Sequence, residues 1–394
     1  MASPRAIRDP FTPGAGYPPP FLAGRDAMLG AFERHLKRAT RVPRHVVLTG
    51  LRGTGKTVLL GEFRKLAQLN GWLSAERELD ETLNETAALV RATASDLLRV
   101  GTGASLALRM RRTGRRLVET FRPKDVAAWG ITYSPAYAKE PPAPPTDRLV
   151  RMFDELMPVV RHQHKGLLLF YDEFHEVWDG RRKGQAPLAT LFNAVKRVQL
   201  KGLPVVLVVS GLPTVIPNIV KSRSYLERDL VVFRLDNLEP TDARAAITRP
   251  LGRSSVTFSP ALIERIVAET RGYPYFLQYY ASFLIESVPD EDRFDVDALE
   301  LLRPLLLNEL DESFFEGRFR KLPRAEREAL LAIARVGERA RIEAVTWPGS
   351  RALLRASIAR LVERGQLYRP AERGEVAFSL PLYRDFLLRQ GVEG

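Results

Sequence analysis

A glycine-rich octapeptide, lying between an apolar run and an amphipathic stretch, constrains the fold of this chain more than any other feature. The apolar run covers residues 44–49, and apolar residues at helical spacing follow over 56–69. Between them the chain reads Gly50, Leu51, Arg52, Gly53, Thr54, Gly55, Lys56 and Thr57. A buried strand that turns through glycines into a helix predicts the first strand–helix unit of a parallel α/β sheet.

This octapeptide, here called the phosphate loop, has the residues that a phosphate chain requires. Its glycines allow backbone angles that point several N–H groups inward, and the following helix directs the positive end of its dipole at an anion. We expect Lys56 to reach the β- and γ-phosphates of ATP and the Thr57 hydroxyl to bind Mg²⁺. The predicted nucleotide-binding residues are Gly50, Leu51, Arg52, Gly53, Thr54, Gly55, Lys56, Thr57 and Val58.

Two adjacent acids follow the apolar run at 167–171. Hydrolysis assisted by a metal ion needs one carboxylate to hold the ion, usually through water, and another to orient and deprotonate the attacking water. We assign the first role to Asp172 and the second to Glu173. Together with Lys56, this pair predicts an ATP hydrolase that uses Mg²⁺.

The remaining apolar runs alternate with helical patterns. Further strands are expected at 166–171, 203–209 and 230–233, and helices at 25–40, 81–100, 146–162 and 185–201. Because these strands show no polar alternation, they indicate a parallel sheet covered by helices on both faces. The predicted fold class is therefore α/β, a P-loop NTPase sheet.

Beyond Glu239 the pattern is almost wholly helical. Helices are expected at 240–249, 260–270, 274–287, 296–310, 324–335, 351–364 and 382–389, with a strand hairpin inside 365–378. Helices followed by a short hairpin are typical of a winged-helix domain. The predicted boundaries are an extended lead-in at 1–20, an ATPase core at 21–237 with a basic, proline-rich insertion at about 101–145, a helical lid at 238–312 and a winged-helix domain at 313–394.

Composition narrows the class of partner. The net charge is +13, with 49 arginines and 11 lysines, which favours an acidic partner such as nucleic acid, although a GC-rich genome raises arginine usage by itself. The chain has no cysteine, no apolar run long enough to span a bilayer and no apolar signal segment in its first 20 residues. We expect a cytoplasmic protein without disulfides and without a membrane partner.

These motifs resemble those of the AAA+ ATPases, in particular the group that combines origin-recognition-like initiators with bacterial and archaeal STAND-type signalling ATPases. Gly24 and Arg25 are similar to the box in which that family lays the adenine against backbone. The run Arg271-Gly272-Tyr273-Pro274-Tyr275 resembles the GxP element, whose proline packs near the base. The resemblance covers about residues 20–310 and implies that Gly24, Arg25 and Pro274 contribute to nucleotide binding.

The resemblance also places a sensor and an arginine finger. Ser210 ends the strand after the acid pair, where the family carries a polar γ-phosphate sensor that initiators commonly supply as Asn. The segment 222–228 is similar to the one that bears the finger, with Arg228 as first choice and Arg223 as second; an ordinary surface role stays open for both. The initiators' Gly-Asp-x-Arg lid sequence is absent from the sequence, which favours the STAND side.

Two regions are candidates for contact with DNA. On a winged-helix reading, the helix at 351–364 presents Arg351, Arg355 and Arg360 to the major groove, with Arg369 and Arg373 on the wing. Packing or protein interaction is an open alternative for that domain. The basic segment 99–124 lacks interleaved aromatics, so phosphates or an acidic protein surface suit it better than stacked bases.

The histidines show no convincing metal-ligand spacing. We expect His162, His164 and His175 to be solvated polar residues.

Three functions are consistent with the sequence. The favoured one is a slowly hydrolysing, ATP-controlled switch, in which the winged helix engages DNA or a protein client. The first alternative is an initiator- or loader-like DNA-binding ATPase that forms a homo-oligomer, with Arg228 reaching a neighbour's ATP. The second is a non-hydrolysing nucleotide-binding scaffold, against which Lys56, Thr57, Asp172 and Glu173 argue.

Overall fold

The computed structural model describes residues 8–14, 16–100, 143–370 and 372–390. They form two compact units. The sheet unit contains Asp26–Gly50 and Lys56–Arg234, and the helical unit contains the described residues of Met1–Arg25, Leu51–Gly55 and Leu235–Gly394. The predicted insertion at about 101–145 lies outside the described residues except for its last three positions.

The sheet unit is built on a five-stranded sheet in the order β2-β3-β4-β1-β5. The strands are β1 (His45–Gly50), β2 (Leu73–Glu78), β3 (Leu167–Asp172), β4 (Val205–Gly211) and β5 (Leu230–Leu235). The pairings of β2 with β3, β3 with β4 and β4 with β1 are all parallel. Since β1, β3 and β4 are buried along their whole length, their unbroken apolar runs face helices on both sides.

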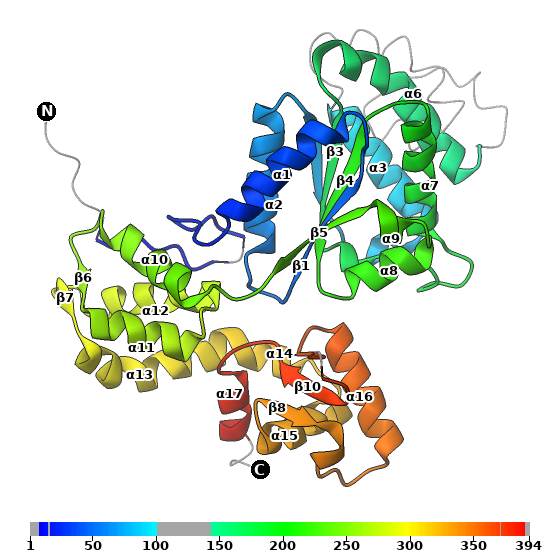
Figure 1. Cartoon of the computed structure of the whole chain (residues 1–394). Helices are drawn as coiled ribbons and strands as arrows, with labels where there is room; N and C mark the ends of the chain where they lie inside the picture. The colour runs from blue at the N-terminus through cyan, green and yellow to red at the C-terminus, as the bar shows by residue number, and fades with distance from the viewer. Residues whose placement is uncertain (1–7, 15, 101–142, 371, 391–394) are drawn as a thin grey trace, which may run out of the picture. The chain divides into compact units, whose positions relative to one another are not determined.

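Helices cover both faces of this sheet, as Figure 1 shows. On one face lie α1 (Asp26–Ala39) and α2 (Lys56–Leu69), where Phe32 and Phe63 stack with ring centroids 4.0 Å apart. On the other face lie α3 (Thr86–Val100), α6 (Pro145–Gln163) and α7 (Pro187–Leu200). The short elements η1 (Glu81–Asn84), η3 (Phe174–Glu176), α8 (Val215–Ser222) and α9 (Leu226–Asp229) connect them. The predicted P-loop NTPase class is confirmed.

Two details of the sheet unit differ from the prediction. Strand β2 was not expected, because it is an edge strand whose sequence, LSAERE, is half polar. The helix expected at 81–100 is interrupted at Glu85, which is extended (φ −88°, ψ 130°) and separates η1 from α3. Its start after Asp80 is correct, since the Asp80 carboxylate accepts a hydrogen bond from the Thr82 N–H.

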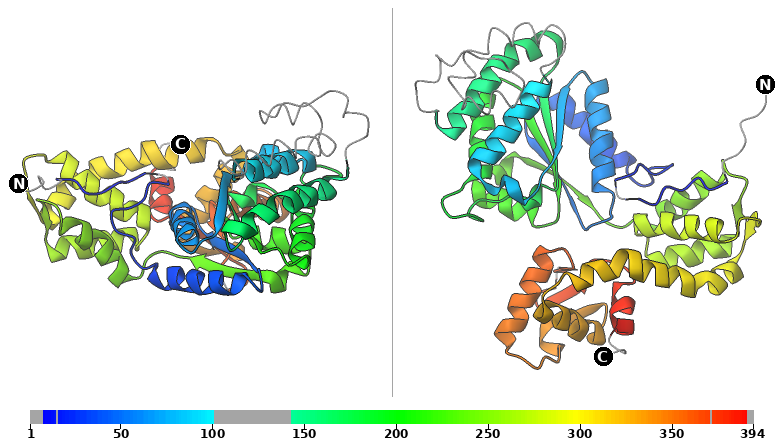
Figure 2. Two further views of the ribbon diagram at one scale, coloured as in Figure 1. Left: turned by 90° about the horizontal axis from the view of Figure 1, so that it is seen from above. Right: turned by 180° about the vertical axis from the view of Figure 1, so that it is seen from behind.

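The helical unit begins with the expected lid helices. These are α10 (Pro240–Leu251), α11 (Pro260–Thr270), α12 (Pro274–Ser287) and α13 (Val296–Leu310), with a parallel pair of two-residue strands, β6 (Thr257–Phe258) and β7 (Arg293–Phe294). Proline is the first residue of α10, α11 and α12, where its missing N–H costs no hydrogen bond. The chain then continues without a break through a π-helical turn, η4 (Asp311–Glu316), into α14 (Gly317–Arg320). Figure 2 shows this run in yellow to gold.

The C-terminal part of the helical unit has the predicted order of elements. It contains three helices, α15 (Arg324–Val336), α16 (Arg351–Glu363) and α17 (Tyr383–Gln390). These helices surround an antiparallel sheet in the order β8-β10-β9. Its strands are β8 (Arg339–Arg341), β9 (Leu367–Tyr368) and β10 (Glu375–Phe378), and η5 (Ile342–Ala344) follows β8. The expected hairpin is present as β9 and β10, to which β8 adds a strand. One apolar core joins this part to the lid helices. Within the described residues, no helix has the length and apolar character needed to cross a bilayer.

Candidate functional site

In the sheet unit, two hydroxyl groups converge on the carboxylate of Asp172 at the end of β3. The Thr57 hydroxyl, from the first turn of α2, donates to Asp172 Oδ2 at 2.6 Å. The Ser210 hydroxyl, from β4, donates to Asp172 Oδ1. With 8% of its surface exposed, Asp172 is held almost entirely by its neighbours. The sequence prediction that Thr57 and Asp172 act together thus has a matching geometry.

The register of the sheet explains this convergence. Tyr171 pairs with Val209 between β3 and β4, so the next residues, Asp172 and Ser210, emerge side by side. Leu48 of β1 pairs with Ser210, so the chain that leaves β1 for α2 does so at the same edge. In parallel sheets this carboxyl edge is the usual place for ligands.

The donors at this edge suit Mg²⁺. Magnesium prefers oxygen ligands and is commonly bound by one or two carboxylates together with waters and substrate phosphates. The Thr57 hydroxyl and the Asp172 carboxylate supply such oxygens, and they lie within 2.6 Å of one another. Among the described residues no group of three or more His, Cys, Asp or Glu side chains is arranged to hold a metal alone, so the phosphates would complete the ligand set.

Glu173 occupies a backbone conformation that is uncommon for a non-glycine residue. Its φ is 50° and its ψ 34°, in the left-handed region, and its N–H donates to Asp172 Oδ1 at 2.8 Å. Such conformations concentrate at functional sites, where the surrounding structure holds them in place. The Glu173 carboxylate contacts His175, whereas the Asp172 carboxylate is held by Thr57 and Ser210.

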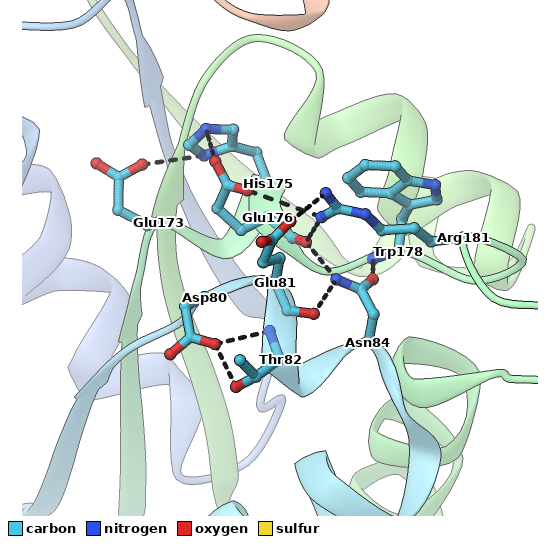
Figure 3. A network of polar contacts seen from close by, with 9 residues as sticks. All are labelled: Asp80, Glu81, Thr82, Asn84, Glu173, His175, Glu176, Trp178 and Arg181. Atoms are coloured by element: carbon cyan, nitrogen blue, oxygen red, sulfur yellow. Dashed lines mark hydrogen bonds and ion pairs between the residues drawn. The ribbon is translucent and has the colours of Figure 1, made fainter.

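A histidine lies beside the Glu173 carboxylate. His175 Nδ1 is 3.2 Å from Glu173 Oε2, and His175 Nε2 is 3.4 Å from Glu176 Oε1 (Figure 3). His175 is only 5% exposed, so the prediction of a solvated residue is wrong for this histidine. It is buried because η3 turns it back over β4, where Nδ1 lies 3.3 Å from the point that a Cβ on Gly211 would occupy.

The network extends from His175 to the start of α3. Arg181 donates to the Glu176 carbonyl and to the Glu81 carboxylate, each at 2.9 Å, and its guanidinium lies 4.3 Å from the centroid of the Trp178 ring. Asn84 donates to the Glu176 carbonyl at 2.7 Å (Figure 3). Contacts from η1 and η3 therefore fix the segment that follows the acid pair. No spacing in the sequence pointed to this arrangement.

In the helical unit, the middle of the phosphate loop is held by Arg25. The Arg25 guanidinium donates to the Thr54 carbonyl at 3.2 Å and to the Asp236 carbonyl at 2.9 Å. Burial lowers the pKa of Arg25, although the nearby charges of Asp236 and Asp242 oppose this shift. Gly24 has a φ of 66°, and a Cβ there would lie 2.6 Å from Asp242 Oδ2. The box at Gly24 and Arg25 thus supports the loop through protein backbone, a contact that the prediction of adenine binding did not include.

Tyr273 makes the second contact with the loop. Its hydroxyl donates to the Arg52 carbonyl at 2.9 Å, and it lies 1.8 Å from the position that a Cβ on Gly53 would take. Gly53 has a φ of 73°, so the close approach and the left-handed backbone both require glycine. Tyr273 is 1% exposed, and its burial raises its pKa, which keeps the phenol protonated as a donor. The sequence prediction named Pro274 of the GxP element for nucleotide binding and did not include Tyr273.

Aromatic rings connect Tyr273 with the C-terminal helix. The ring of Tyr273 lies 4.7 Å from that of Phe276 in α12, which lies 6.0 Å from Phe315 in η4. Phe315 stacks on Tyr383 of α17 at 5.4 Å. Apart from Tyr273, each of these rings is fully buried. This series, from Tyr273 to Tyr383, is called the aromatic column below.

The two candidate finger residues differ in their contacts. Arg223 donates to Asn193 Oδ1 at 2.9 Å and to the Ser222 carbonyl at 3.1 Å, so it is used inside the sheet unit. Arg228, in α9, is exposed, and in the described part of the chain it has no carboxylate within ion-pair distance. Arg228 remains the better candidate, and its role stays a prediction.

The arginines predicted to contact DNA also differ. Arg351 donates to the carbonyls of Ile342, Glu343 and Val345, so it ties α16 to η5. Arg360 lies 3.9 Å from the buried carboxylate of Glu326. All five side chains are exposed, and among the described residues Arg355, Arg369 and Arg373 have no such protein partner. A surface for DNA on α16 would therefore be smaller than predicted.

The chain is similar in sequence and in fold to known proteins. Residues 22–209 match the AAA ATPase domain family, and residues 312–387 match a domain of unknown function, DUF8462. The fold is similar to that of the ORC2 protein of Aeropyrum pernix, solved as ADPNP–ADP complexes, with 14% identity, a TM-score of 0.55 and coverage of 96% of this chain and 97% of that one. It is also similar to a Walker-type ATPase of Pyrococcus abyssi, with 16% identity, a TM-score of 0.54 and coverage of 93% and 96%. No curated protein sequence matches.

We expect Gly53→Ala to destabilise the protein more than Gly55→Ala. Both glycines have positive φ, 73° and 90°, so each alanine incurs a cost of about 1–2 kcal/mol for a left-handed residue. Only at Gly53 does the new methyl group also meet Tyr273, whereas a Cβ at Gly55 has nothing within 4 Å. Thermal unfolding of both variants measures the difference. Equal shifts in Tm would show that Tyr273 does not pack on the loop.

Proposed function

We propose that this protein binds ATP with Mg²⁺, hydrolyses it slowly and acts as a nucleotide-controlled switch, a function that the match of residues 22–209 to the AAA ATPase domain family supports. The observation that carries the proposal is the hydrogen bond from the Tyr273 hydroxyl to the Arg52 carbonyl. It ties the loop residues Leu51–Gly55 to the lid, and these residues belong to the same compact unit as the lid and the C-terminal part. A change in the loop on binding or hydrolysis thus acts directly on that unit.

The proposed hydrolysis divides the work among four side chains. Lys56 neutralises the β- and γ-phosphates, and Thr57 and Asp172 hold Mg²⁺. Glu173 accepts a proton from the water that attacks the γ-phosphorus, while the bond from that phosphorus to the bridging oxygen breaks and ADP leaves. The buried position of Lys56, the Thr57–Asp172 contact and the turn at Glu173 support these roles.

The contacts of Ser210 favour slow turnover. Its hydroxyl donates to Asp172, so in this conformation it holds the metal-binding carboxylate. Detection of the γ-phosphate by Ser210 would require that hydrogen bond to be exchanged for one to the phosphate. A switch benefits from such a cost, because its nucleotide state then persists.

The coupling from loop to output follows the aromatic column. Interiors pack too closely for a ring to move without moving its neighbours. A shift of Tyr273 is therefore transmitted through Phe276 to Phe315, in the π-helical turn between the lid and the C-terminal part. Wide turns of this kind often mark functional sites in helices. The winged-helix assignment of the C-terminal part, and a DNA or protein client for it, belong to this proposal.

An initiator-like function is the second candidate. It is favoured by the exposure of Arg228, which as an arginine finger would stabilise a neighbouring subunit's transferring phosphoryl group in a homo-oligomer. It is disfavoured by Arg351 and Arg360, which have partners inside the helical unit. Light scattering with a slowly hydrolysed ATP analogue separates the two, since only the initiator-like function requires assembly.

We expect Glu173→Gln to reduce kcat for ATP hydrolysis by about 10²–10⁴-fold, because the amide accepts no proton from water. The dissociation constant for ATP should change by less than about threefold, since the amide keeps the size of the carboxylate. Steady-state hydrolysis and calorimetric titration measure the two effects. Glu62→Gln, on the surface of α2 beside Lys65, is the matched control and should leave both unchanged. A wild-type rate no higher than that of Glu173→Gln would instead support the non-hydrolysing scaffold.

We expect Tyr273→Phe and Phe315→Leu to affect ATP affinity non-additively. Each change perturbs a member of the same packed series, and coupled residues show interaction energies of about 0.5–3 kcal/mol in double-mutant cycles. Calorimetric titration of an ATP analogue into both single variants and the double variant gives this energy. Phe258→Leu, in the same unit but outside the aromatic column, is the control and should add to Tyr273→Phe. Additivity in both pairs would refute transmission through the column.

A further inference from the structure

A hollow in the sheet unit is lined by arginines that none of the proposed chemistry uses. It has a volume of about 540 Å³ and lies where α1 ends and the chain turns into β1. Its lining comprises Ala31, Arg34, His35, Arg38, Arg41, Val42, Arg44 and Val231. A volume of this size falls in the usual range of ligand sites.

One stripe of α1 forms the first wall. Ala31, Arg34, His35 and Arg38 are spaced by three and four residues, so they lie on one side of the helix. Phe32, Leu36 and Ala39 occupy the side that packs into the protein. The burial of that second side fixes the rotation of α1 and hence the direction of the arginines.

Hydrogen bonds hold the second wall, the turn at 40–44. The N–H groups of Arg41 and Val42 donate to the Arg38 carbonyl at 3.0 and 2.9 Å, so the turn continues directly from the helix. His35 Nε2 lies 3.0 Å from the Arg44 carbonyl oxygen, and the Arg44 guanidinium donates to the Leu230 carbonyl at 2.6 Å. The hollow is therefore bounded by fixed backbone on α1, the turn and β5.

The hollow has an excess of positive charge. It is lined by four guanidinium groups and no carboxylate. In the part of the chain that the structure describes, Arg34, Arg38, Arg41 and Arg44 have no carboxylate within ion-pair distance, whereas the neighbouring Lys37 pairs with Glu33 at 3.2 Å. Like charges gathered on a fixed frame repel one another, and an anion bound among them would relieve this repulsion.

Stabilisation of the helix does not explain the whole cluster. Basic residues in the last turn of a helix complement its dipole, which accounts for Lys37 and Arg38. Arg41 and Arg44 lie beyond the helix, and Arg34 lies before its last turn, with NH1 folded back to 3.4 Å from the position of a Cβ on Gly30. The hydrogen bond to the Leu230 carbonyl explains the position of Arg44, so Arg34 and Arg41 are the two arginines whose place in the cluster neither the helix nor the turn explains.

We propose that this arginine-lined hollow binds the phosphodiester backbone of a nucleic-acid strand. Guanidinium groups match phosphate oxygens with paired N–H donors. Arg34 and Arg38 are about 6 Å apart along the helix axis, and the turn carries the series further, so the cluster extends over more than one phosphate. The apolar lining at Ala31, Val42 and Val231, with the arginine stems, suits the sugar carbons between phosphates.

The site is separate from the phosphate loop. Arg44 precedes β1, and the last residue of β1, Gly50, is the first residue of the loop, so residues 45–49 lie between them and the extended chain from Arg44 to Gly50 spans about 20 Å. The proposal goes beyond the nucleotide-controlled switch and does not depend on ATP binding. Loss of ATP hydrolysis in Glu173→Gln should leave strand binding at this hollow intact, which distinguishes a failure of one proposal from a failure of the other.

The first test measures how binding depends on salt. Fluorescence anisotropy of a labelled 20-nucleotide oligodeoxythymidine strand is recorded with the full chain over a range of NaCl concentrations. The double variant Arg34→Gln/Arg38→Gln removes two phosphate contacts, so the slope of log affinity against log salt should fall in magnitude by about 1.4. At about 100 mM salt we expect roughly tenfold weaker binding.

The matched control removes the same charge outside the hollow. Lys37→Gln/Lys65→Gln changes two exposed lysines of the sheet unit, one of them on α1 itself, and lowers the net charge equally. It should leave the affinity within about threefold and the slope nearly unchanged. Equal effects of the two double variants would overturn the proposal, because they would show binding by net charge alone. No binding of the strand by the wild type would overturn it as well.

His35 gives a second readout that does not require a folding-neutral variant. Burial lowers the pKa of His35, and the charges of Arg44 and Arg38 lower it further, whereas the contact with the Arg44 carbonyl opposes this shift. The other charged residues of the lining are Arg34 and Arg41, and β5 contributes only the apolar Val231. A bound phosphate would raise the pKa of His35, because it offsets the positive field. Histidine NMR, assigned with His35→Gln among the five histidines, should show this rise with the oligonucleotide. A rise with tripolyphosphate but none with the oligonucleotide would refute a nucleic-acid ligand.

Discussion

The hydrogen bond between the Tyr273 hydroxyl and the Arg52 carbonyl is the contact on which the proposed switch depends. The phosphate loop leaves β1 and enters α2, yet its residues Leu51–Gly55 belong to the compact unit of the lid and the C-terminal part. Arg25 and Tyr273, which are both in the helical unit, donate to carbonyls of this loop segment. Gly53 makes the contact with Tyr273 possible, because any side chain there would displace Tyr273. The glycines of the loop thus serve contact with protein as well as the expected contact with phosphate.

The sequence predicted those parts of the site whose residues lie next to one another in the chain. Gly50 to Thr57 and Asp172 to Glu173 each come directly at the end of a buried strand, so an apolar run and its last polar residues were enough to find them. Helical patterns gave α2, α12 and α13 with their observed bounds, and apolar runs gave β1, β3 and β4. Such runs did not predict β2, because an edge strand exposes polar side chains and loses the continuous apolar pattern.

Tertiary contacts account for the features that the sequence did not reveal. His175 read as solvated because nothing near it in the chain shows that η3 folds it over Gly211 and beside Glu173. No role was predicted for Tyr273, because its partner, Arg52, is 221 residues away. Pro274 is the first residue of α12. The steric constraint in this element lies at Gly272, where a Cβ would be 2.1 Å from the Leu238 carbonyl oxygen. The arginines likewise differ in their contacts, since Arg351 and Arg44 bind backbone carbonyls. Within the described residues, Arg34, Arg38 and Arg41 of the α1 hollow have no carboxylate within ion-pair distance.

Hydrogen–deuterium exchange of the full chain, with and without a slowly hydrolysed ATP analogue and Mg²⁺, tests the switch most directly. If the phosphate loop acts on the helical unit through Tyr273, the analogue should change exchange both in the loop and in peptides covering η4 and α14 (Asp311–Arg320). Binding that changes exchange in the loop and around Asp172 but leaves residues 311–320 unaltered would contradict it, and would leave an ATPase whose nucleotide state is not transmitted.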